Sequence, residues 1–261
     1  MSMRGLLIVS LMIEAVTGCS PTKDEGGKLA GIEAGRQYLL ERIDDVAVAQ
    51  IYADGFEALS LREKVLTWHL YQSALAGRDI FYDQRYEHNL EMREVLEEIL
   101  THADGVNPKT LTEIHRYTKL FWINTGPYNN LTARKFVLKV TPEQFADAVR
   151  VAAANGAIFP TRDSENLNAL LDRLEPMFFD ETHDAIVTNK SPAEGLDILL
   201  SSSNNLYDGV AMSDLDGFEE RYPLNSRLVK RDGRLVEEVY RINDDGRYVT
   251  ELTEVVRHLE A

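Results

Sequence analysis

The six histidines of this chain could serve as metal ligands or as general acids and bases, but their spacing matches no catalytic motif. They are His69, His88, His102, His115, His183 and His258. None is followed by glutamate, so the HExxH helix of many zinc peptidases does not occur. Glu98 and His102 stand one helical turn apart and could share a metal. Because no third ligand is near them in sequence, an ordinary side-chain pair on a helix is favoured.

The residues that could act as nucleophiles also lack a motif. The sequence has no GxSxG elbow and no glycine-rich phosphate loop, and its single cysteine is Cys19. Adjacent acidic residues point apart on a helix or a strand, which favours solvated surface charge over paired catalytic carboxylates. These acidic pairs are Glu97–Glu98, Glu219–Glu220 and Glu237–Glu238. We therefore expect no catalytic residues and no metal or cofactor site in this chain.

The stretch WINTGPYNNLTARKF, residues 122–136, is the most unusual polar segment of the sequence. A Gly-Pro pair breaks the chain direction, and three asparagines fall within seven positions. Phe121, Trp122 and Phe136 flank the segment and are expected to be buried, although a loop this polar usually faces water. The segment is therefore either a plain connection between buried elements or a rigid edge presented to a ligand.

Composition limits the range of partners. The chain has 261 residues and a formal charge of -15, with an isoelectric point near 4.9. A surface this acidic repels phosphate backbones, so we expect no nucleic-acid binding. One cysteine excludes both a disulfide framework and a cysteine-based metal site.

The N-terminal residues resemble a bacterial lipoprotein signal. Arg4 precedes the apolar run Leu6–Ile13, and small residues lead to Cys19. We expect residues 1–18 to be a signal peptide, Cys19 to be lipidated, and the polar, glycine-rich residues 19–30 to be a flexible tether. This places the protein in the bacterial cell envelope, on the periplasmic side, held to the membrane by its lipid. Glu14 departs from the pattern, and the alternative is a buried N-terminal helix with an incidental cysteine.

Residues 28–123 are expected to be helical. Ser60 and Glu63 have the spacing of a capping box. The helix that follows carries Val65, Leu66, His69, Leu70 and Ala74 on one face. This pattern predicts that the face is buried and that His69 is a hydrogen-bonded core residue.

Residues beyond the polar segment predict an α+β protein, predominantly helical, with a few antiparallel strands and hairpins near the C-terminal end. We expect a strand over 135–140, helices over 141–156, 164–178 and 191–202, and a last helix over 250–261. Thr141, Ser164 and Ser191 are the expected caps. Two alternating apolar runs meet at Asp232–Gly233, which predicts a tight hairpin.

Four stretches together resemble the N-terminal part of bacterial dipeptidyl peptidase III, in the same order and with similar spacing. The resemblance extends from about Leu61 to Ile242. The stretches are LYQSALAGRDIFYDQRYEHNLEMREVLEEI, WINTGPYNNLTARKFVLKVTPEQF, DILLSSSNNLYDG and YPLNSRLVKRDGRLVEEVYRI. The second is similar to the loop NYKSFGDxKF of eukaryotic members, which aligns Tyr128, Lys135 and Phe136.

The resemblance implies part of a two-lobed zinc exopeptidase that releases dipeptides from the N-termini of short peptides. The family holds zinc on HExxGH and EExRAD-like helices in its later lobe, and neither motif occurs in this sequence. We therefore expect residues 31–261 to form the N-terminal lobe without the zinc lobe, and to be inactive alone. In the full-length enzyme, zinc would come from the other lobe.

The resemblance also implies which residues meet substrate. Asn129, Asn130, Leu131 and Thr132 would edge the site for the N-terminal side of a short peptide, with Tyr128 and Phe136 anchoring the loop. Leu131 stands where eukaryotic members have phenylalanine, and Thr132 where they have glycine. Two alternatives remain open: the asparagines only satisfy the backbone of a turn, or the chain is a non-catalytic envelope lipoprotein that binds peptides or a partner protein.

Overall fold

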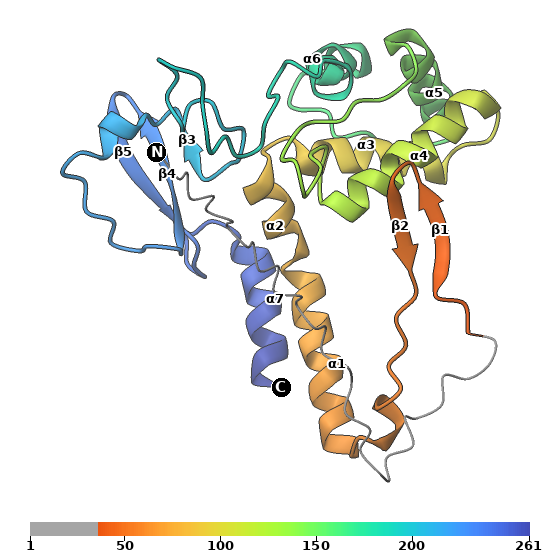
Figure 1. Cartoon of the computed structure of the whole chain (residues 1–261), viewed down its shortest axis with the longest axis horizontal. Coiled ribbons are helices and arrows are strands. Elements are labelled where there is room, and N and C mark those ends of the chain that lie inside the picture. Colours follow the sequence, from red (N-terminus) through yellow and green to blue (C-terminus); the bar gives the residue numbers. More distant parts are fainter. Residues whose placement is uncertain (1–35) are drawn as a thin grey trace, which may run out of the picture.

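The computed structural model describes residues 36–261, so the expected signal peptide, tether and lipidated Cys19 lie outside the described residues. Helices α3 to α6 form a body, α1 and α7 run side by side as an arm, and β3, β4 and β5 form a separate small sheet (Figure 1). The β1–β2 hairpin contacts α4. The α+β class with a predominance of helix is confirmed. The elements are β1 (Leu39–Ile43), β2 (Val46–Ala49), η1 (Phe56–Ala58), α1 (Leu61–Ala76), α2 (Arg78–Arg85), α3 (Asn89–Thr101), α4 (Pro108–Asn124), α5 (Pro142–Ala154), α6 (Leu167–Phe179), β3 (Tyr207–Asp208), η2 (Met212–Leu215), β4 (Ser226–Arg231), β5 (Arg234–Val239) and α7 (Val249–Glu260).

The body contains the main hydrophobic core. Helix α3 buries Met92, Val95, Leu96 and Ile99, the i, i+3, i+4, i+7 spacing of one helix face. Helices α4, α5 and α6 add aromatic rings to this core, and Phe121 of α4 is fully buried. Helix α5 begins at the expected cap, Thr141, whose hydroxyl accepts from the Gln144 N–H in a capping box. The periodicity of these helices therefore predicts their burial correctly.

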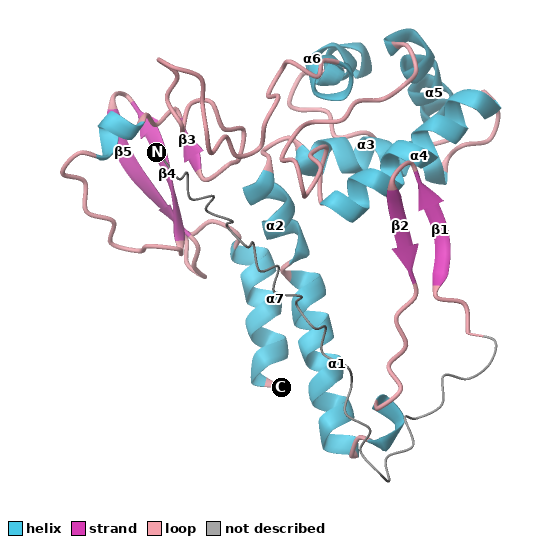
Figure 2. Cartoon of the chain, viewed as in Figure 1, coloured by secondary structure: helices cyan, strands magenta, loops and turns pink. Residues whose placement is uncertain are grey.

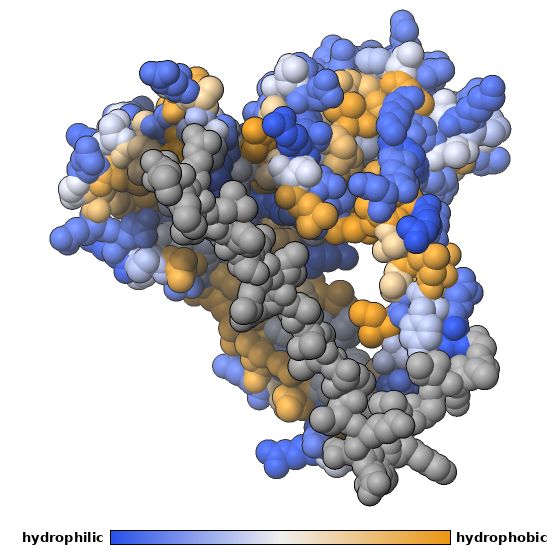
Figure 3. All heavy atoms as spheres, in the orientation of Figure 1, coloured by the Kyte–Doolittle hydropathy of each residue, from blue (hydrophilic) through white to orange (hydrophobic). Residues whose placement is uncertain are grey.

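The arm follows the expected local structure but not the expected burial. Ser60 and Glu63 form the predicted capping box at the start of α1. The predicted buried face is nevertheless exposed, with Val65, Leu66 and Leu70 46%, 57% and 50% exposed. Among the described elements, only α7 packs closely along α1, and much of the apolar surface of the arm is exposed (Figure 3).

His69 is half-buried at the contact between the two arm helices, and the prediction that it is a core residue is wrong. Its Nδ1 lies 3.2 Å from Nδ1 of His258, which is buried on α7. The Trp68 ring packs edge-on against both histidine rings.

The hairpin of β4 and β5 is the one that the sequence predicts. Asp232 and Gly233 have φ values of 50° and 74°, as the tight hairpin turn requires. Strand β3 pairs with β4 in parallel, so the small sheet is mixed and not purely antiparallel as expected.

Three predicted elements are wrong. Residues expected to continue a helix form the β1–β2 hairpin, which turns at Asp44 with φ 52°. Residues 135–140 make no strand; a single bridge joins Lys135 to Tyr128. Residues 191–202 form turns instead of a helix (Figure 2), because Gly195 takes φ 84° and Asp197 caps the amides of residues 199 and 200.

Helix α6 begins later than the sequence suggests. Its cap is Asn166, whose Oδ1 accepts a hydrogen bond from the Ala169 N–H, and not Ser164. Among the helices of residues 36–261, none has the length and hydrophobicity needed to span a membrane.

Candidate functional site

The C-terminal end of α4 holds the polar segment in place. Thr125 and Gly126 have φ values of 53° and 128°, which turn the chain sharply after the helix. A Cβ on Gly126 would lie 2.6 Å from Oδ1 of Asn89. Asn89 is fully buried, and its Nδ2 donates to the carbonyls of Tyr82 and Thr125. Only glycine fits at position 126, and the loop therefore starts from a fixed point.

The base of the loop is closed by backbone pairing around Tyr128. Tyr128 and Lys135 form an antiparallel bridge, and the Phe136 N–H donates to the Pro127 carbonyl at 2.8 Å. The Tyr128 ring is fully buried and its hydroxyl donates to the Asp184 carbonyl at 2.8 Å. Burial raises the pKa of the Tyr128 hydroxyl, which keeps it a neutral donor. Phe136 is half-buried against the core.

Lys135 is a second buried anchor, with a role that the sequence did not reveal. Its Nζ donates to the carbonyls of Pro176 and His183, at 2.9 and 2.8 Å. Burial lowers the pKa of Lys135 to about 8, against the opposing effect of the Asp184 and Asp180 carboxylates. The lysine therefore joins the loop to the end of α6 and to the segment that follows it.

The flanking aromatic residues differ in burial. Phe121 is fully buried, whereas Trp122 is 45% exposed and its Nε1 donates to Oε1 of Glu97 at 2.9 Å. The expectation that both seek burial is therefore wrong for Trp122, which turns its indole toward a carboxylate at the surface.

The tip of the loop is exposed and internally braced. Oδ1 of Asn129 accepts from the N–H groups of Leu131 and Thr132, at 2.9 and 3.0 Å. The Asn130 N–H donates to Oδ1 of the buried Asn124. The Leu131 side chain is 95% exposed. Asn129 thus serves the backbone of the turn, while the side chains of Asn130, Leu131 and Thr132 face solvent.

A pocket of about 520 Å³ lies between this tip and residues 186–191. All four sequence-predicted site residues, Asn129, Asn130, Leu131 and Thr132, line it. The opposite wall is held by backbone pairing, since the Val187 N–H donates to the Ala133 carbonyl and the Lys135 N–H to the Ala185 carbonyl. Sequence reasoning did not find this wall, because it lies more than fifty residues away along the chain.

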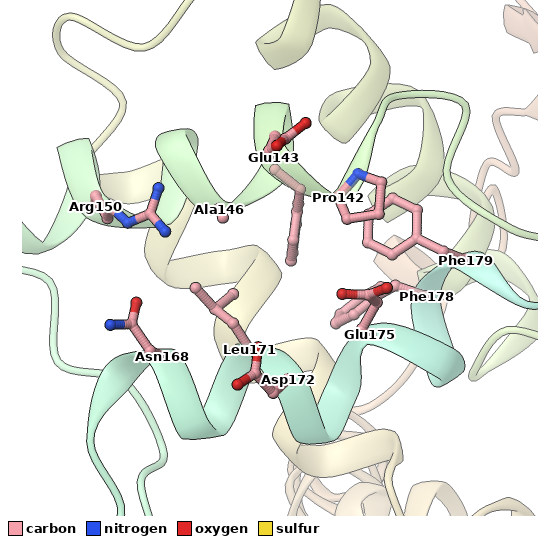
Figure 4. A pocket seen from close by; sticks show the side chains of 11 residues that line it. Pro142, Glu143, Ala146, Arg150, Asn168, Leu171, Asp172, Glu175, Phe178 and Phe179 are labelled. Atoms are coloured by element: carbon pink, nitrogen blue, oxygen red, sulfur yellow. The ribbon is translucent and has the colours of Figure 1, made fainter.

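A separate groove of about 480 Å³ lies between α5 and α6. Figure 4 shows Leu171 and Phe179 between the two helices, with Glu143 and Glu175 at its edges. This groove shares no lining residue with the loop pocket.

Within residues 36–261, the histidines and acidic residues do not converge on a metal site. Among residues 36–261, no group of three or more His, Cys, Asp or Glu side chains could hold a metal ion. Nδ1 of His102 lies 3.2 Å from Oε2 of Glu98, and the same oxygen accepts from the Ile158 N–H. The pair therefore caps local structure, as an ordinary helix pair does.

Comparison of the chain with models of protein families and with curated proteins finds no match.

Proposed function

We propose that this chain is the peptide-binding lobe of a dipeptidyl peptidase III-like zinc exopeptidase. The observation that carries the proposal is the loop pocket, in which an exposed tip stands on buried anchors beside a space of about 520 Å³. A rigid edge of this kind is what peptide recognition requires, because little conformational freedom is lost on binding. The four stretches that resemble the peptidase family support the same conclusion.

Each side chain at the tip would have a distinct role. The amide of Asn130 offers a donor and an acceptor to a peptide backbone without adding charge. Leu131, which is 95% exposed, would bury apolar area against the peptide. Tyr128 and Lys135 would act indirectly, by holding the tip in place.

The zinc that the resemblance implies has no fitting donor set among residues 36–261. We therefore assign no catalytic step to the described chain. Under the proposal, zinc and its ligands belong to the family's other lobe, and a lipid on Cys19 would hold the protein to the membrane on the periplasmic side of the bacterial envelope.

The arm favours a second candidate function, that of a non-catalytic lipoprotein docking onto a partner protein. Trp68, Tyr71 and Phe81 are 53%, 58% and 56% exposed on and beside α1. Trp68 and Tyr71 stand one helical turn apart on α1, and exposed aromatic side chains that share a helix face are typical of protein-binding surfaces.

Calorimetric titration of the purified protein with tetra-alanine tests the proposal. We expect binding that Asn130→Ala and Leu131→Ala each weaken several-fold, since each removes one contact worth about 1 kcal/mol. Ile158→Ala is the matched control, because Ile158 is 78% exposed and lies outside the pocket. Equal loss in all three variants, or no binding at all, would contradict the role of the loop.

A second measurement separates the two candidates. The protein is mixed with the isolated zinc lobe of a dipeptidyl peptidase III, and release of Ala-Ala from tetra-alanine is followed. Release that requires both components supports the enzyme lobe, whereas peptide binding without release supports the lipoprotein.

A further inference from the structure

The loop pocket has a charge opposite to that of the chain. The chain carries a formal charge of -15. The pocket is nevertheless lined by three cationic side chains, those of Arg85, Arg134 and Lys190. None of the described residues that line it carries a carboxylate. The remaining polar lining is neutral and consists of asparagine, serine and threonine side chains.

Two of these cations have no other task in the described structure. Arg134 and Lys190 are exposed, and neither forms an ion pair with a residue in the range 36–261. Most other arginines of the body are already paired, as Arg173 is with Glu91 and Glu165. The charge of Arg134 and Lys190 is therefore available to a ligand.

Arg85 is the third cation that lines the pocket, beside the base of the loop. Its Nη2 donates to the Tyr128 carbonyl at 3.0 Å, which fixes the guanidinium beside the base of the loop. Its Nε is buried and has no hydrogen-bond partner within the described part of the chain. Burial lowers the pKa of Arg85, because no carboxylate compensates for the lost hydration. An incoming anion would supply that compensation.

We propose that this pocket binds the carboxylate of an acidic side chain of a short peptide, and that it disfavours a basic side chain in the same place. Guanidinium groups bind carboxylates through paired, charge-assisted hydrogen bonds, and Lys190 adds a point charge. An ammonium in the same place would face three cations without a counter-ion. The inference rests on the proposed function, since it names the class of peptide that the loop selects.

Three peptides that differ in one side chain test the inference: Ala-Ala-Asp-Ala-amide, Ala-Ala-Asn-Ala-amide and Ala-Ala-Lys-Ala-amide. Asp and Asn have nearly the same shape, so their difference reports charge. We expect the parent protein to bind the Asp peptide several-fold more tightly than the Asn peptide, and the Lys peptide least tightly. Raising the salt concentration should reduce the difference.

Variants connect that preference to the pocket. Arg134→Gln and Lys190→Gln should each weaken binding of the Asp peptide roughly two- to five-fold, the range expected for exposed ion pairs, and leave the Asn peptide unchanged. Lys109→Gln is the matched control, because Lys109 is also exposed, forms no ion pair among the described residues and lies outside the pocket. It should change neither affinity.

The outcomes separate the inference from the proposed function. Equal affinity for all three peptides, or a preference for the Lys peptide, overturns the inference and leaves peptide binding intact. No binding of any peptide overturns both. Inorganic phosphate is the last probe: if it competes with the Asp peptide and binds as tightly, the pocket takes a free anion, so the anion preference holds and the peptide function fails.

Discussion

The body and the arm have the same local capping signals, but their apolar side chains differ in burial. Helix α1 of the arm and α5 of the body both start at a capping box, with Ser60 and Glu63 in one and Thr141 and Gln144 in the other. In the body, apolar periodicity leads to burial, and Leu96 and Phe121 are both fully buried. In the arm, the same kind of periodicity leaves Leu66 57% exposed. A helix pattern therefore predicts a helix, but burial needs a surface to receive it.

The difference extends to the loop. Its tip is polar and exposed, yet Tyr128, which lies in the main core, and the buried Lys135 attach it to the body. Exposure at the loop tip thus accompanies rigidity, whereas exposure in the arm accompanies an incomplete core. Ligand-facing side chains on rigid supports lose little entropy on binding, which is why the loop is the better candidate site.

The largest expected effect contrasts one buried residue with one exposed residue. Phe121→Ala should lower the free energy of unfolding by roughly 3–5 kcal/mol, because it leaves a cavity in the core of the body. Leu66→Ala should change it by about 0.5 kcal/mol or less, because the side chain is already solvated. Urea unfolding of both variants measures this. Similar losses would show that the arm surface is covered in solution.

The contributions of two histidines to stability should change with pH in opposite directions. The first is His88, in the body. Burial disfavours the charged His88 ring, but its ion pairs with the carboxylates of Glu87 and Glu91, at 3.4 and 3.7 Å, outweigh this and raise its pKa to about 9. The resulting stability is fully present below pH 6.5 and is lost as the pH rises through 9. The difference from 6.5 corresponds to roughly 3 kcal/mol at most. Parent and His88→Gln should therefore converge in stability between pH 6 and pH 10.

His258 in the arm should behave in the reverse way. Burial of the ring, with Arg257 and His69 close by and Glu254 opposing them, lowers its pKa below the usual 6.5. The neutral ring then contributes stability above pH 6.5, and that stability is lost as the pH falls. The protection of the α7 amides against hydrogen exchange, relative to intrinsic exchange at each pH, should fall between pH 7.5 and pH 5 in the parent, and less so in His258→Gln. A fall of the same size in both would remove the histidine pair as its cause.

Two glycines with a positive φ show how much the surroundings of the loop restrict its start. Gly126 is packed against Asn89, whereas Gly156 is not. Gly126→Ala should cost roughly 1–3 kcal/mol, since it combines backbone strain with a clash against Asn89. Gly156→Ala carries only the strain, about 1 kcal/mol, because no described atom lies within 4 Å of its added Cβ. Thermal melts compare them. Equal losses would mean that the α4 terminus yields to the added methyl group.

The smallest effect concerns the two capping boxes. Ser60→Ala and Thr141→Ala should each cost their helix about 1 kcal/mol. In the arm, the loss should appear as faster amide exchange at the start of α1 with little change in global unfolding. In the body, it should lower the midpoint of the global transition. A global shift of equal size for Ser60→Ala would place the arm in the same cooperative unit as the body.

The sequence alone determined those features whose causes are local. Capping residues at Ser60 and Thr141 set helix starts, and Asp232–Gly233 set a hairpin, because each depends on backbone groups within a few residues. The alternation of such signals also determined the α+β class. On the same basis, the polar segment 122–136 stood out as a loop, whereas the burial of its flanks was not determined, since Phe121 is buried and Trp122 is exposed.

Only the tertiary structure decided what these elements meet. Residues 46–49 are too few to declare a strand before they pair with β1, and residues 191–202 form turns held by Asp197. The pocket needs Arg85 and residues 186–191 brought to the loop by long-range hydrogen bonds, which no local pattern encodes. Whether an apolar face is buried depends likewise on the surface opposite it, so α3 lies in the core while the predicted apolar face of α1 remains largely exposed to water.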